Sequence, residues 1–231
     1  MKDLDRIKLL GVDYIWFMPI HPIGEVNKKG ELGCPYSISD YRAVTPEYGT
    51  MEDFKELVSA IHEKGMKCMI DVVYNHTSHE SVLSKEHPEF FYKKPDGRFG
   101  NKVGDWTDVI DLDYTNKDLW DYQLETLKMW AKIVDGFRCD VASLVPIEFW
   151  NRARKEVAEV NPDCLWLAES VEYGLIKYAR DTGFNCLSDS ELYQAFDILY
   201  DYDVYPKYLA YVDGEIPLSE YINALNQQEY I

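Results

Sequence analysis

The stretch VDGFRCDVA, residues 134–142, predicts a short buried strand that ends in charge. Side chains alternate along a strand, so Gly136, Arg138 and Asp140 share one face, while the residues between them form an apolar face. An unpaired buried charge costs several kcal/mol, so the arginine and the carboxylate are expected to pair. Two interpretations remain open here: a pair that only locks the strand, or a carboxylate kept ionised by its neighbour and able to act as a nucleophile.

Two further stretches share this design and favour the second interpretation. Residues 164–170, CLWLAES, form an apolar run that closes on Glu169, and residues 66–76, MKCMIDVVYNH, end in Asn75 and His76. Helical sequence follows each run. Polar groups at the C-terminal ends of parallel strands are the layout of an active site on an α/β sheet or barrel.

The chain alternates such apolar runs with helical patterns, which predicts an α/β fold with about five parallel strands. Strands are expected at residues 12–20, 66–73, 134–142, 164–170 and 184–187, and helices at 3–10, 50–64, 116–133, after Pro146, before Gly183 and in the Tyr-rich tail. Thr50, with Asp53 three residues on, has the pattern of a helix N-cap. Residues 77–115 interrupt this alternation, and so long a connection is usually functional or a small subdomain.

Several motifs are also familiar as a set. Residues 71–76 (DVVYNH), 136–140 (GFRCD) and 168–169 (AE) resemble the first three signature regions of the α-amylase family, glycoside hydrolase family 13. Residues 33–41 (GCPYSISDY) and 46–50 (PEYGT) resemble flanking segments of the same family. The order and spacing of these segments are kept over essentially the whole chain, which makes the set far more specific than any single motif.

The resemblance implies a TIM (β/α)8 barrel, incomplete in this chain because a closed barrel has eight strands. Residues 1–76 and 116–231 would form the partial barrel. Residues 77–115 would be an insertion like domain B of the family, which walls one side of the sugar cleft. We expect this chain alone to be nearly inactive, because an incomplete barrel would hold Asp140 and Glu169 loosely and small displacements reduce rates strongly.

The resemblance also implies the chemistry of a retaining α-glycoside hydrolase or transglycosylase acting on α-glucosidic bonds of oligo- or polysaccharides. Asp140 would attack the anomeric carbon, and Glu169 would protonate the leaving oxygen and then activate water. Starch-degrading members often carry Lys-His after the nucleophile, where this chain has Ser143 and Leu144. The loss of two polar groups leaves shorter α-glucosides, or transglycosylation, open.

A substrate-binding set of Tyr36, Asp71, His76 and Arg138 follows from the same resemblance. Arg138 would keep Asp140 charged, and Asp71 would brace Arg138 from the neighbouring strand. Tyr36 and His76 would hold and stack the sugar beside the scissile bond.

No cofactor is expected to be required, but the resemblance implies a possible structural calcium ion. Asn75 and Asp111 match positions that bind calcium in many family members, and oxygen ligands from loops suit that ion.

Composition limits the partners of the protein. The chain has 231 residues, of which 46% are hydrophobic and 28% charged, an ordinary soluble mix. The net charge of −17 argues against nucleic acid and anionic membranes as partners, and it suits a neutral α-glucan or α-glucoside substrate. The 18 Tyr and 6 Trp supply aromatic faces of the kind that pack on sugar rings. The sequence makes no prediction of the oligomeric state.

Five cysteines, an odd number without any C-x-x-C motif, indicate small buried hydrophobic residues in a reducing compartment. No signal peptide opens the chain and no apolar run approaches the length of a membrane span. We therefore expect a cytoplasmic protein, with the reservation that a missing N-terminus would hide a signal.

Two other functions stay open from the sequence. One is a non-catalytic relative with the α-amylase fold that binds a glycan or a protein partner. The other is an unrelated α/β enzyme that uses Asp and Glu. Both signature acids and Arg138 are present, which favours the glycosidase. The lack of a Gly-rich phosphate loop and of G-x-S-x-G counts against the common nucleotide-binding and serine hydrolase classes.

Overall fold

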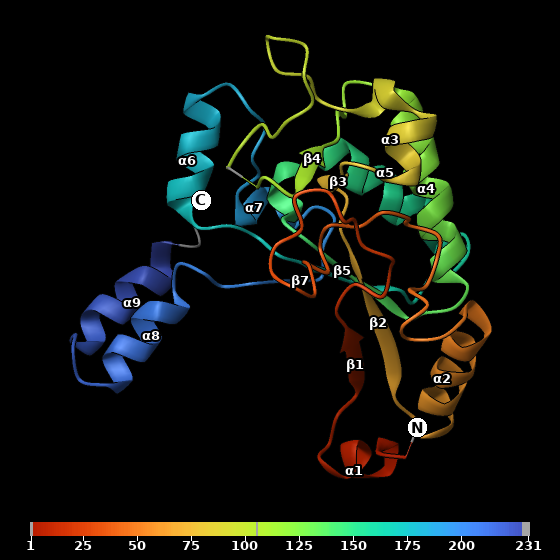
Figure 1. Ribbon diagram of the computed structural model, residues 1–231. Coiled ribbons are helices and arrows are strands. Elements are labelled where there is room, and N and C mark those ends of the chain that lie inside the picture. Colours follow the sequence, from red (N-terminus) through yellow and green to blue (C-terminus); the bar gives the residue numbers. More distant parts are fainter. Residues whose placement is uncertain (1, 105, 228–231) are drawn as a thin grey trace.

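The main sheet has five parallel strands, which confirms the predicted α/β fold. The structure, a computed structural model, describes residues 2–104 and 106–227 (Figure 1). The strands pair in the order β1-β2-β5-β6-β7, with β1 at Tyr14–Phe17, β2 at Lys67–Val72, β5 at Gly136–Cys139, β6 at Leu165–Ala168 and β7 at Ile198–Leu199. Over the described residues the fold is therefore an incomplete (β/α)8 barrel.

Helices connect the strands, as parallel pairing requires. They are α1 Leu4–Leu9, α2 Met51–Glu63, α4 Lys117–Ala131, η2 Ala142–Leu144, α5 Ile147–Ala158, α6 Tyr173–Asp181 and α7 Asp189–Leu192. The predicted cap of α2 is present, because the Thr50 side chain accepts from the Asp53 N–H while the Asp53 carboxylate accepts from the Thr50 N–H.

Aromatic side chains fill the core between the sheet and helices α4 and α5. Trp130, Trp150, Trp166 and Phe149 are fully buried. The ring centroids of Phe149 and Trp150 lie 5.1 Å apart, and those of Trp150 and Trp166 lie 6.4 Å apart. Burying one large apolar side chain contributes ~1.5–3 kcal/mol to the free energy of unfolding. This core therefore stabilises the packing of β5 and β6 against the helices.

A small antiparallel sheet lies outside the main sheet, as expected for an insertion. The segment contains β3 His76–Ser78, α3 Val82–Glu86, η1 Pro88–Phe90 and β4 Val109–Asp111. His76 lies opposite Asp111 in the β3–β4 pair, so the insertion is attached directly to the C-terminal end of β2. The boundaries 77–115 stay a prediction.

The strand predicted at residues 184–187 is wrong. The Leu187 N–H donates to the Ser143 carbonyl at 2.7 Å, so this segment bonds to a loop instead of joining the sheet. Part of its apolar surface packs in a small cluster with Leu144, which explains the hydrophobic pattern. Ser188 then begins α7 at once through a capping box. The fifth strand is β7, which pairs with β6.

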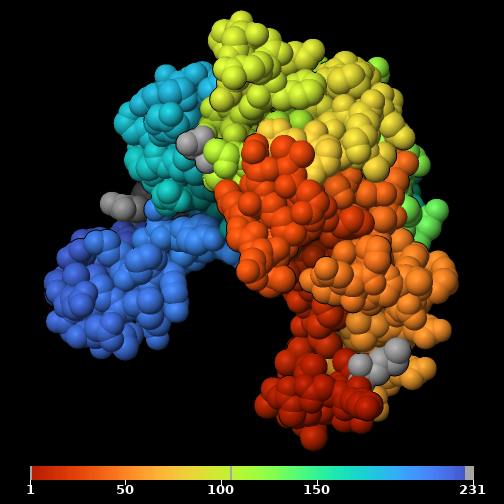
Figure 2. All heavy atoms as spheres, viewed as in Figure 1, coloured from red at the N-terminus to blue at the C-terminus, as the bar shows by residue number. Residues whose placement is uncertain are grey.

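The C-terminal region is helical, as predicted from its sequence. It consists of α8 Tyr205–Val212 and α9 Leu218–Gln227, which pack against each other. Figure 2 shows this pair as a lobe that stands away from α1 and β1, the other end of the sheet. Over the described ranges no helix is both long and apolar enough to cross a membrane.

Candidate active site

Arg138, on β5, joins three carboxylates from three neighbouring strands. Its Nη1 lies 3.0 Å from Asp71 Oδ1 and 2.9 Å from Asp140 Oδ1. Its Nη2 lies 2.8 Å from Glu169 Oε2. The register explains this convergence, because Asp71 on β2 lies opposite Arg138, while Asp140 and Glu169 directly follow β5 and β6. We call these four residues the Arg138 cluster.

Glu169 has two further contacts, and one of them comes from a strained backbone. The Val141 N–H donates to Glu169 Oε2 at 2.9 Å, and the Tyr202 hydroxyl donates to Glu169 Oε1 at 3.0 Å. Val141 has φ +37°, in the left-handed region that β-branched residues rarely adopt. Conformations of this kind concentrate at functional sites. Both carboxylate oxygens of Glu169 are thus held in place.

Aromatic rings surround the guanidinium of Arg138. The Cζ of Arg138 lies 5.3 Å from the ring centroids of Trp16 and Tyr200, and 5.8 Å from that of Tyr36. The Tyr36 hydroxyl also donates to Asp71 Oδ2 at 3.3 Å. Cation–π contacts at this range stabilise a buried cation, and the same rings offer faces on which a sugar can pack.

One guanidinium does not neutralise three carboxylates, so the cluster has an excess of negative charge when all three are ionised. The pKa values of Asp140 and Asp71 are both raised. Burial raises the pKa of Asp140 well above its ordinary value, with further increases from Glu169 and Asp71 that outweigh Arg138. Burial likewise raises the pKa of Asp71 to about 6. The pKa of Arg138 is raised, because attraction by the three carboxylates exceeds the opposing effect of burial. Arg138 favours ionised Asp140 as expected, while burial and the two neighbouring carboxylates oppose it.

His76 lies at the start of β3, next to the same strand ends. Its side chain is buried, its ring centroid lies 5.6 Å from that of Trp106, and its backbone carbonyl accepts from the Tyr41 hydroxyl at 2.7 Å. Burial lowers the pKa of His76 to about 4, so the ring is neutral at pH 7. A neutral imidazole can donate one hydrogen bond and accept another, which suits the hydroxyls of a sugar.

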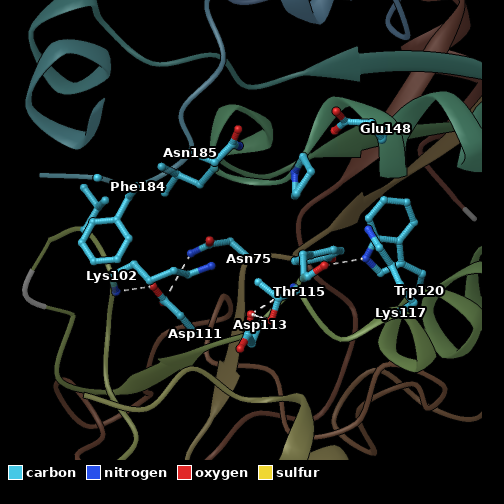
Figure 3. A pocket seen from close by; sticks show the side chains of 15 residues that line it. Asn75, Lys102, Asp111, Asp113, Thr115, Lys117, Trp120, Glu148, Phe184 and Asn185 are labelled. Atoms are coloured by element: carbon cyan, nitrogen blue, oxygen red, sulfur yellow. Dashed lines mark hydrogen bonds between the residues drawn. The ribbon is translucent and has the colours of Figure 1, made fainter. Parts of the chain in front are cut away.

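Asn75 and Asp111 meet where the insertion joins the barrel. Asn75 Nδ2 lies 3.4 Å from Asp111 Oδ1, and both residues line a cavity of about 510 Å³ that Lys102 also lines (Figure 3). In residues 2–104 and 106–227, no group of three or more His, Cys, Asp or Glu side chains is arranged to hold a metal ion. The calcium expectation therefore depends on the remaining donors at this junction.

Sequence reasoning missed the tyrosines at the site. Tyr200 and Tyr202 follow β7, just as Asp140 and Glu169 follow β5 and β6. The signal was present as alternating tyrosines after Ile198–Leu199, but the fifth strand had been placed at another segment. No sequence signal distinguished Trp16 from the rest of its apolar strand.

Parallel strands with connecting helices, and a cluster of acids at their C-terminal ends, define a (β/α)8-barrel protein of the kind that builds active sites on strand ends. The chain belongs to the α-amylase family, because residues 1–180 match the family described as alpha amylase, catalytic domain.

Individual relatives agree with this assignment. An alpha-1,4-glucan:maltose-1-phosphate maltosyltransferase from Rhodospirillum rubrum is 32% identical over 188 residues, which cover 72% of this chain and 27% of that protein. Alpha-amylase 3 from Dictyoglomus thermophilum is 31% identical over 208 residues, 77% of this chain and 40% of that protein. The chain thus spans less than half the length of these curated relatives.

Solved structures allow a comparison of geometry. An alpha-amylase from Lactobacillus plantarum has a TM-score of 0.95 at 56% identity, over 99% of this chain and 54% of that one. A maltogenic alpha-amylase from Thermotoga neapolitana has a TM-score of 0.83 at 40% identity, over 99% of this chain and 50% of that one. The chain therefore spans about half of each solved relative.

Proposed function

We propose that this chain carries the catalytic centre of a retaining α-glycoside hydrolase or transglycosylase acting on α-glucosidic bonds of oligo- or polysaccharides. The observation that carries the proposal is the single guanidinium of Arg138 that bonds both Asp140 and Glu169 at adjacent strand ends. Paired carboxylates flanking one bond are the requirement for glycoside cleavage. The named relatives, α-amylases and a maltosyltransferase, support the same substrate class.

In this proposal the two acids start the reaction in different protonation states. Asp140 must be ionised to attack the anomeric carbon, and Glu169 must be protonated to release the leaving oxygen. Both acids contact Arg138, which favours the ionised form of Asp140. The C–O bond breaks as the Asp140 ester forms. Glu169 then takes a proton from water, which attacks and frees Asp140.

Substrate contacts are proposed for the groups around the cluster. The Tyr36 ring and the neutral His76 ring would hold the sugar, while Asp71 keeps Arg138 in place. Ser143 and Leu144, which follow the nucleophile, are both buried in η2 and present little surface to a leaving sugar chain. Their burial supports a preference for shorter α-glucosides or for transfer.

The test is an assay of the complete gene product on an aryl α-glucoside, maltooligosaccharides and starch, with the first product anomer identified by ¹H NMR. We expect the α-anomer to form first. A β-anomer formed first would contradict retention. Calorimetric binding of maltooligosaccharides without any turnover would favour the non-catalytic alternative.

Residues 1–231 should be assayed in parallel. We expect turnover by these residues alone to be lower by ~10²-fold or more, because small displacements of catalytic groups reduce rates strongly. Trp16 contacts Arg138 from the edge strand β1 and is 42% exposed, so this side of the site is open to solvent. Equal turnover would show that the five-stranded sheet is sufficient.

We also propose a cytoplasmic location. All five cysteines are free thiols and four of them are buried, an arrangement suited to a reducing compartment. Fractionation of cells that express the gene product would test this, and recovery outside the cytoplasm would contradict it.

A further inference from the structure

The junction between the insertion and the barrel contains a partly buried cation that belongs to the protein. Lys102 comes from the insertion and extends into the cavity that Asn75 and Asp111 line, and Figure 3 shows these three side chains gathered together. The Lys102 Nζ donates to the Leu112 carbonyl at 2.8 Å. The carboxylates of Asp111 and Asp113 lie close enough to attract this ammonium.

Nitrogen donors already satisfy the oxygens of Asp111. The Lys102 backbone N–H donates to Asp111 Oδ2 at 2.7 Å. The Asn101 amide donates to Asp111 Oδ1 at 3.2 Å, and the Asn75 amide lies 3.4 Å from the same oxygen. Asp111 is 1% exposed, so these contacts with nitrogen are its principal environment. They leave Asp111 little capacity to coordinate a metal ion.

This donor set does not fit a calcium ion. Calcium takes six to eight oxygen ligands, and an ammonium in the same cavity would repel it. Asn75 Oδ1 is buried and has no hydrogen-bond partner among the described residues, but it supplies only one oxygen. An ammonium with three donors needs far fewer acceptors, and the carbonyl of Leu112 already provides one.

We infer that Lys102 replaces a bound metal ion and fastens the insertion to the barrel as an internal cation. Its backbone binds Asp111, its ammonium binds the carbonyl of Leu112, and Asn75 closes the junction from the end of β2. Because β2 also carries Asp71, this junction connects the insertion to a strand of the Arg138 cluster. The inference concerns the stability of the fold and does not rest on the proposed function.

The test is thermal unfolding of the complete gene product, followed by circular dichroism, with either EDTA or CaCl₂ in large molar excess over the protein. We expect the wild-type Tm to be the same in both conditions. Lys102→Met should lower the Tm by about 4–8 °C, because a partly buried hydrogen bond from a charged group is lost. Lys85→Met, which changes an exposed lysine of α3, is the matched control and should leave the Tm unchanged.

Two results would overturn the inference. One is a wild-type Tm that falls in EDTA or rises in calcium, since this would reveal a bound ion. The other is a Lys102→Met variant with the Tm of the wild type. The wild-type comparison stands by itself if Lys102→Met does not fold.

Discussion

Two cations in this molecule, the buried Arg138 and the partly buried Lys102, contact acidic neighbourhoods in different ways. In the Arg138 cluster one guanidinium contacts three carboxylates, so negative charge is in excess. At the Lys102 junction, which comprises Lys102, Asn75, Asp111 and the Leu112 carbonyl, the acid is met by nitrogen donors on both oxygens. In the first case burial and the excess of acid raise the pKa of Asp140 and Asp71, while in the second the donors on Asp111 and the acceptor for Lys102 hold two segments together. The balance of charge therefore differs between the site proposed for chemistry and the junction.

The largest expected effect tests whether the excess of acid is used for chemistry. Asp140→Asn removes the proposed nucleophile and should lower kcat of the complete gene product by ~10⁴-fold or more. Turnover of maltooligosaccharides measures the effect. Asp181→Asn, which changes an exposed acid at the end of α6, is the control. A loss of less than tenfold for Asp140→Asn would remove Asp140 from the mechanism.

A second change separates the roles of the two acids. Glu169→Gln should slow cleavage of natural glucosides by ~10²–10⁴-fold, because the proton donor to the leaving oxygen is lost. Aryl glucosides with good leaving groups need little protonation, so formation of the glycosyl ester from them should be much less affected. Single-turnover kinetics on both substrates measure the difference. Equal losses would contradict the assignment of Glu169 as the acid.

A third change compares the two cations in stability. Arg138→Met leaves buried carboxylates without their partner and should lower the free energy of unfolding by about 3–5 kcal/mol. Lys102→Met should lower the free energy of unfolding by less than Arg138→Met does. It removes one hydrogen bond to the Leu112 carbonyl and a cation near the carboxylates at the junction. Urea denaturation of both variants gives the comparison. A larger loss for Lys102→Met would reverse the ranking of the two sites.

The smallest expected effect is a change with pH in the free energy of unfolding, caused by Asp71 of the Arg138 cluster. The pKa of Asp71 is about 6 when folded and near 3.9 when unfolded, so the folded state binds more protons between these values. Stability contributed by protonated Asp71 is therefore lost as pH rises through 6. His76, whose pKa is lowered, acts in the opposite direction, so the wild type is best compared with Asp71→Asn at each pH.

From pH 5 to pH 7 the wild type should lose about 1 kcal/mol of unfolding free energy relative to Asp71→Asn. Urea denaturation at the two pH values measures this difference. A difference that stays constant between the two pH values would show that Asp71 is ionised throughout and would contradict the raised pKa.

The sequence predicted the parts of the site that local pattern encodes. Asp140 and Glu169 each end an apolar run, so a parallel sheet had to bring them to one edge. The sharing of Arg138 with Glu169 could not be predicted, because it depends on the register of β5 with β6. The two-residue strand β7 is too short to produce a pattern, and the tyrosine contact to Glu169 was missed with it.

The cation at the junction was also beyond sequence reasoning. Lys102 lies in a connection without regular structure, and lysines in such segments are usually solvated. Only the three-dimensional structure shows that the Lys102 ammonium donates to the Leu112 carbonyl. This contact lies beside the cavity where the sequence predicts a calcium ion.

The left-handed backbone of Val141 has a consequence for evolution and for engineering. A valine at φ +37° costs about 1–3 kcal/mol, yet its N–H directs one bond at Glu169. Selection for thermal stability alone should therefore favour glycine at this position, since glycine adopts this conformation without strain. The same replacement would free the turn between Asp140 and η2 to move. Variants selected for heat resistance at this position should thus gain stability while Glu169 is held less rigidly.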